Sequence, residues 1–74
     1  PNDALHNAGL DVLECILTLE SDACREAALH GLGHWHSANP QRVKTIIDTY
    51  LKQHPNLRAE LIAYAQSARA GCVL

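Results

Sequence analysis

The chain carries two helix hairpins in 74 residues, and the helix starts of one hairpin recur in the other with an offset of about 35 positions. Each of the four expected helices follows a dipeptide that suits a helix N-terminus: Asn2-Asp3, Ser21-Asp22, Asn39-Pro40 and Asn56-Leu57. A period of this length is typical of stacked helical repeats. The spacing therefore predicts an all-α chain of two stacked antiparallel hairpins.

The expected domain spans residues 1–74, with the first hairpin over about 3–36 and the second over about 39–71. The chain has no Met and begins with Pro1, so we expect it to be a piece of a longer protein, close to its C-terminal end. Neighbouring repeats of that longer chain are then expected partners.

The first helix, expected from Asp3 to Leu19, is apolar on two sides. One stripe is formed by Leu5, Ala8, Val12, Ile16 and Leu19, and the other by Leu10, Leu13 and Leu17. A helix with two apolar sides packs between neighbours. We expect the stripe of Leu10, Leu13 and Leu17 to be an interaction surface, facing a preceding repeat, a second copy or a protein partner.

The second helix places Cys24, Ala27, Ala28, Leu32 and Trp35 on one face. Trp35 continues this stripe and is expected in the core, although a tryptophan between two histidines also suits an exposed anchor for a partner. Ala27 and Gly31, four residues apart, allow close approach by another helix. The alternative is that Gly31 and Gly33 fray the helix early.

The second hairpin has the clearest amphipathic pattern of the chain. Its first helix follows Pro40, which is well placed at a first helical position, and buries Val43, Ile46, Ile47, Tyr50 and Leu51. Its second helix is expected from Leu57 to about Ala70 and ends at Gly71. No segment shows the alternation of a strand.

The charge distribution is uneven. The net charge is −2, which argues against nucleic acid as a partner, since phosphate binding needs clustered Lys and Arg. Residues 1–26 contain six acidic residues against one arginine, a net charge of −5, and residues 27–74 contain five basic against two acidic residues, a net charge of +3. This polarity favours head-to-tail contact between copies or repeats.

The three cysteines, Cys15, Cys24 and Cys72, form no CxxC motif, and any single intrachain disulfide leaves one of them unpaired. This favours a reducing compartment, so we expect a soluble, cytoplasmic protein. No apolar run approaches the roughly 20 residues of a membrane span, and no signal segment opens the chain. Cys72 is third from the end, whereas a prenylation box has its cysteine fourth from the end, so we expect no prenylation.

The segment Ala23-Cys24-Arg25-Glu26-Ala27-Ala28-Leu29-His30-Gly31-Leu32-Gly33 resembles the second-helix signature of HEAT-type repeats of the PBS-lyase kind, in which an Arg/Glu-Ala-Ala stretch leads to a Leu-Gly pair. The resemblance covers one repeat; residues 58–64 match only by spacing and lack the Leu-Gly pair. It implies an α-solenoid fragment that serves as a protein-binding scaffold, with the second hairpin as a repeat or a terminal cap.

The strongest candidate for chemistry is the cluster of His30, His34 and His36. His30 and His34 stand four residues apart, a spacing that lets two imidazoles chelate one metal ion, and His36 is a candidate third ligand. No carboxylate lies within the segment to act as a general base. The alternative function is therefore a metal-binding or enzyme-accessory domain.

No catalytic constellation emerges from the remaining residues. Cys24 lies in the first turn of a helix, where a thiol can be activated, but it also lies on the apolar face, where free cysteine behaves as a small hydrophobe. We therefore expect no enzyme activity, no cofactor and no metal. The expected function is protein–protein interaction or scaffolding, and a self-associating helical domain is a third possibility.

Overall fold

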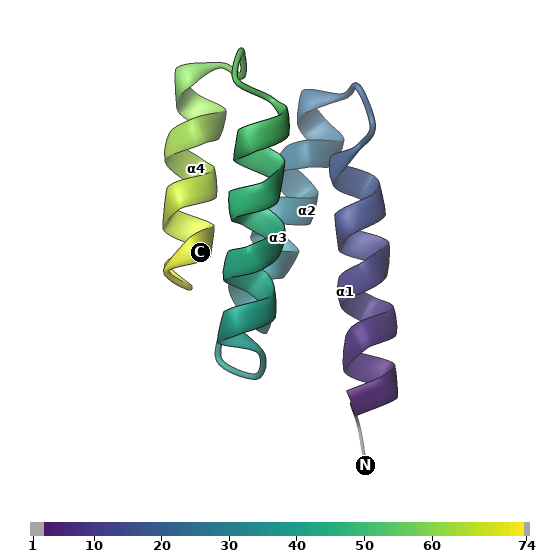
Figure 1. The fold of residues 1–74 in the computed structure, drawn as a ribbon. Helices are drawn as coiled ribbons and strands as arrows, with labels where there is room; N and C mark the ends of the chain where they lie inside the picture. Colours follow the sequence, from purple (N-terminus) through teal and green to yellow (C-terminus); the bar gives the residue numbers. More distant parts are fainter. Residues whose placement is uncertain (1–2, 74) are drawn as a thin grey trace.

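The computed structural model describes residues 3–73, which form four helices and no strand. Helices α1 (Asp3–Leu17) and α2 (Asp22–Trp35) form one antiparallel hairpin, and α3 (Pro40–Gln53) and α4 (Ala59–Arg69) form the second (Figure 1). The prediction of an all-α chain with two helix hairpins is confirmed. None of the described helices is long and apolar enough to cross a membrane.

Helix α2 is the centre of the packing. It lies between α1 and α4, against which it makes its most extensive contacts, and α3 covers it from the side seen in front in Figure 1. All four helices contribute to one core, whose buried side chains are Leu10, Leu17, Ala28, Leu29, Leu32, Val43, Ile46, Ile47, Tyr50, Leu61, Ala65 and Ala68. The two hairpins therefore share a single apolar interior.

The glycines of α2 allow its neighbours to approach closely. A methyl group at Gly31 would lie 3.0 Å from a methyl carbon of Leu13 in α1, so the missing side chain leaves room for this leucine. Gly33 is buried beneath Val73, near the C-terminus. The helix continues to Trp35, so the glycines serve packing, and the alternative of early fraying is wrong.

Two of the residues expected at helix N-termini, Ser21 and Pro40, occupy the positions that the sequence predicts. The Ser21 hydroxyl accepts a hydrogen bond from the backbone N–H of Cys24 at 3.3 Å, as expected for an N-cap. Pro40 is the first residue of α3. Asn39 precedes it but makes no side-chain cap; its amide instead contacts Nδ1 of His6 at 3.2 Å. The Asn2 cap lies outside the described residues.

Two helix boundaries differ from the expected ones. Helix α1 ends at Leu17, because the N–H groups of Thr18 and Leu19 bond to carbonyls three residues back in a tighter turn. Helix α4 begins at Ala59 and not at Leu57, because the backbone of Arg58 is still extended, with ψ of 146°. In both cases an apolar residue outside the helix, Leu19 or Leu57, continues the helical spacing of apolar residues. The sequence therefore predicts a longer helix than the structure has.

Ion pairs join the two hairpins at two places. One set links α1 to α3, and another pair links the start of α2 to the segment just before α4. Arg42 of α3 contacts the carboxylates of Asp11 and Glu14, and Arg58, just before α4, pairs with Asp22 through Nε and Oδ2 at 2.7 Å. The acidic first hairpin and the basic second hairpin thus satisfy part of their opposite charge within one chain. The expected head-to-tail contact between copies or repeats stays a prediction.

Helix α4 ends in a Schellman turn at Gly71. Gly71 has φ of +78°, its N–H donates to the carbonyl of Ala68 at 2.9 Å, and the N–H of Cys72 donates to that of Ser67 at 2.8 Å. The prediction that Gly71 terminates the last helix is confirmed. The turn directs the chain back toward α2, where Val73 covers Gly33.

Gly71→Ala should therefore lower the free energy of unfolding by about 1–2 kcal/mol, the usual cost of a left-handed conformation for a residue with a Cβ atom. The new methyl group would also lie 2.7 Å from Nδ1 of His36. Urea unfolding followed by circular dichroism measures the difference. An unchanged midpoint would mean that this turn does not hold the C-terminal segment in place.

Arg69 lowers the pKa of Asp48 below its ordinary value of 3.8, chiefly through a hydrogen bond from Nε to Oδ1 at 2.7 Å. Because the folded state binds this proton less readily than the unfolded state, the pair stabilises the fold above pH 3.8 and stops doing so as the pH falls through the lower folded-state value. Asp48→Asn should accordingly lower Tm at pH 7 by a small amount and have less effect near pH 2. Thermal melts at the two pH values test this, and an equal loss at both would contradict it.

Candidate functional site

The outer side of α1 carries an apolar stripe that no described residue covers. The exposed large hydrophobic side chains are Leu5, Val12 and Leu19, with 73%, 58% and 48% of their surface accessible. Leu5 and Val12 are seven residues apart, so they lie on one side of α1, and Leu19 follows in the turn after the helix. Ala8 and Cys15 lie between them and are also exposed. We call these five residues the α1 stripe.

The predicted interaction residues of α1 lie on the opposite stripe. Leu10 and Leu17 are 0% and 1% exposed and belong to the core, and Leu13 is half-buried against Gly31 of α2. The assignment of Leu10, Leu13 and Leu17 to an outward surface is therefore wrong. The spacing detected both stripes, but which one faces inward depends on the rotation of α1.

The burial of Leu10 and Leu17 in the core fixes that rotation, and polar contacts with α3 agree with it. Arg42 donates to Oδ1 of Asn7 at 3.3 Å and contacts the carboxylates of Asp11 and Glu14, which all lie on one side of α1. With this polar side against α3 and Leu13 against α2, the α1 stripe is left facing outward. Arg42, which makes these polar contacts, lies 31 residues from Asp11 in sequence.

Trp35 packs at the edge of the core near the beginning of α1. Its ring stands edge-on to that of His6, with centroids 5.0 Å apart, and a methyl group at Gly9 would lie 3.1 Å from Cζ2 of the indole. The side chain is half-buried and contacts the core cluster. Trp35 therefore packs against α1 at Gly9 and His6 and is not part of the α1 stripe.

The histidines of α2 separate into a pair and an isolated residue. Nε2 of His30 lies 3.0 Å from Nε2 of His34, and Nδ1 of His30 lies 2.9 Å from the hydroxyl oxygen of Tyr64 in α4. His36 is packed against Gly71 at the C-terminal turn. Among residues 3–73 no three metal-ligating side chains converge, so the predicted third ligand does not join the pair.

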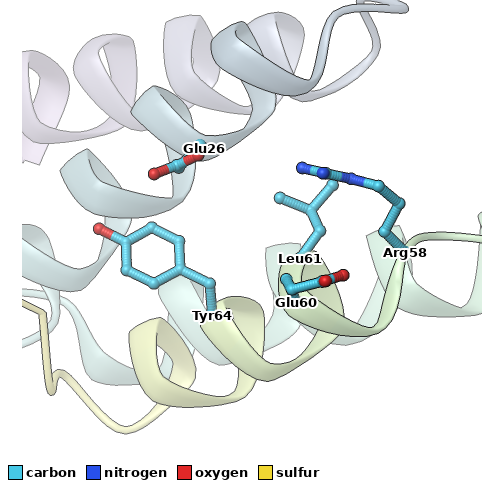
Figure 2. A pocket seen from close by; sticks show the side chains of 5 residues that line it. All are labelled: Glu26, Arg58, Glu60, Leu61 and Tyr64. Carbon is cyan, nitrogen blue, oxygen red and sulfur yellow. The ribbon is translucent and has the colours of Figure 1, made fainter.

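A shallow hollow between α2 and α4 lies beside this pair. Its walls include Glu26 and Tyr64, which extend toward each other from the two helices in Figure 2, and His30 lines its continuation along α2. Arg58, Glu60 and Leu61 form its other end. The hollow is polar at its rim and places a carboxylate, a phenol and an imidazole within one surface region.

The cysteines do not form a reactive centre with these groups. Cys15 and Cys72 are exposed free thiols, and Cys24 is a half-buried free thiol in the first turn of α2. Cys15 belongs to the α1 stripe and Cys72 to the C-terminal turn. Their different positions make them useful as reporters of two separate surfaces.

Comparison of the chain with protein-family models, with curated proteins and with solved structures finds no match. The resemblance of α2 to a HEAT-type repeat therefore stays a hypothesis. Two surface features are the candidates for function: the α1 stripe and the cluster of His30, His34 and Tyr64.

The structure places one apolar stripe of α1 in the core and the other at the surface. This assignment can be tested by introducing a charged residue into each stripe. Leu17→Glu should cost more than about 3 kcal/mol of stability, because it buries a carboxylate with no partner in the core. Val12→Glu should change stability by no more than about 0.5 kcal/mol, because position 12 is in solvent. Urea midpoints of the two variants measure the difference, and equal midpoints would show that α1 is rotated otherwise.

Proposed function

We propose that this chain is a protein-interaction module of the helical-repeat type and that its docking surface is the α1 stripe. The observation that carries the proposal is the position of the exposed large hydrophobic residues: among the described residues, all three lie on this one stripe. Scattered exposed leucines need no explanation, whereas an aligned row of them is typical of a surface that another helix covers.

The energetics support a docking role. Burying an exposed Leu or Val side chain contributes roughly 1.5–3 kcal/mol, so covering Leu5, Val12 and Leu19 together is a substantial driving force. Small side chains at Ala8 and Cys15 between them leave room for the side chains of a facing helix, as in knobs-into-holes packing. The partner surface that fits best is the apolar side of a helix.

The hairpin architecture is consistent with a HEAT-like solenoid fragment. In a stack of hairpins each unit covers one side of the next, so the uncovered side of the first hairpin is where a preceding hairpin or a partner protein would pack. On this proposal the module has no catalysis of its own. Neither nucleic acid nor a membrane is a proposed partner, because the stripe is apolar and narrow and carries no cluster of basic residues.

A reducing compartment such as the cytoplasm is the proposed location. The three cysteines are all free thiols, and two of them are exposed. Exposed free thiols persist where glutathione and thioredoxin keep them reduced. Cys15 in particular would be exposed to oxidation on an uncovered α1 stripe.

The proposal is tested with the chain as bait and in solution by itself. We expect the wild-type chain either to increase in mass with concentration in light scattering or to retain a protein partner, and Val12→Glu to abolish that association while keeping its helix content. Thr45→Glu, an exposed position on α3, is the matched control and should leave association unchanged.

Cys15 provides a second readout at the surface itself. Its alkylation by a maleimide should slow when the partner or a second copy is bound, while the exposed Cys72 continues to react at its original rate. Equal protection of both thiols would point to a different surface. A chain that stays monomeric and retains the same proteins as Val12→Glu would overturn the proposal.

A further inference from the structure

The pair of histidines on α2 has the geometry of a metal chelate, and this observation is independent of the α1 stripe. His30 and His34 occupy successive turns of one helix, so their rings project in the same direction. Their Nε2 atoms lie 3.0 Å apart, with ring centroids 4.5 Å apart and ring planes at 67°. Two nitrogens at this distance share either one proton or one metal ion.

We propose that His30 and His34 form a two-histidine site for a divalent transition-metal ion of the Ni²⁺ or Cu²⁺ type. With metal–nitrogen bonds of about 2.1 Å, neighbouring ligands at roughly 90° are about 3.0 Å apart, whereas tetrahedral ligands are about 3.4 Å apart. The observed separation of 3.0 Å matches the right-angled arrangement, which Ni²⁺ and Cu²⁺ prefer. Water completes the coordination, because His34 is exposed.

Tyr64 acts as a positioning residue for this site. Its hydroxyl oxygen lies 2.9 Å from Nδ1 of His30. When Nδ1–H donates to that oxygen, the proton is held on Nδ1 and the lone pair of Nε2 is free to bind metal. Metal-binding histidines characteristically make such a second hydrogen bond, which fixes both the tautomer and the ring orientation.

The surroundings favour a cation. Glu26 lies one turn before His30 on α2 and lines the same hollow as His30 and Tyr64. It is exposed, and its negative charge raises the local concentration of cations without serving as a ligand, since no third ligating side chain converges on the pair. Metal competes with protons for Nε2, so acidic buffers weaken binding.

The test is a titration of the full chain with Ni²⁺ by isothermal calorimetry, with the thiols kept reduced. Ni²⁺ is chosen because Cu²⁺ oxidises cysteine. We expect one ion per chain, and His34→Gln should raise the Kd at least about tenfold because it removes one of two ligands. His36→Gln is the matched control: it removes a neighbouring histidine outside the pair, retains the same three cysteines and should change the Kd less than about twofold.

Tyr64→Phe distinguishes positioning from packing. The variant keeps the aromatic ring and removes only the hydrogen-bond partner of His30, so it should weaken Ni²⁺ binding by several-fold and shift the imidazole ¹⁵N resonances of His30 toward the other tautomer. A structural role alone would change Tm and leave the tautomer as it was.

A direct readout does not depend on any variant. Ni²⁺ is paramagnetic, so substoichiometric amounts should broaden the imidazole resonances of His30 and His34 and leave those of His6 and His54 sharp. Absence of Ni²⁺ binding, equal affinity in His34→Gln and His36→Gln, or uniform broadening of all the histidines would overturn the proposal.

Discussion

The close approach of α1 and α4 to α2 is the constraint on which the rest of the structure depends. At Gly31 the missing side chain leaves room for Leu13 of α1, and at Gly33 it leaves room for Val73, which follows α4. A glycine in a helix interior costs up to about 1 kcal/mol relative to alanine. The two contacts use the bare backbone and hold α1 and the C-terminal segment against one central helix.

The uncovered stripe of α1 follows from the same packing. With Leu10 and Leu17 buried in the core and Leu13 against Gly31, the side chains of Leu5, Val12 and Leu19 are left exposed. The chain therefore leaves an apolar row exposed while twelve of the described hydrophobic residues form its core. On the function proposed above, this row is the surface that a partner covers.

Features decided by local chemistry could be predicted from the sequence. The Ser21 cap, Pro40 at a helix start and the left-handed Gly71 each depend on a few neighbouring residues. Features decided by distant contacts could not. The inward stripe of α1 depends on the core that the other three helices provide, the bond of Asn39 to His6 replaces its cap, and the packing of His36 against Gly71 removes it from the histidine cluster. Helical spacing predicts which side of a helix a residue occupies, but it does not show which distant residue its side chain contacts.

The distribution of charge limits how a partner can be recognised. Arg42 and Arg58 are already paired with Asp11, Glu14 and Asp22 of the first hairpin, through exposed or partly exposed contacts that contribute little to stability and mainly align the hairpins. These pairs neutralise part of the opposite charge of the two hairpins within one chain. If the α1 stripe is the docking surface, as proposed, recognition there depends on apolar shape, that is, on how well a facing helix fills the spaces beside Ala8 and Cys15. A partner matched in this way is selected by packing, and its affinity should depend only weakly on salt.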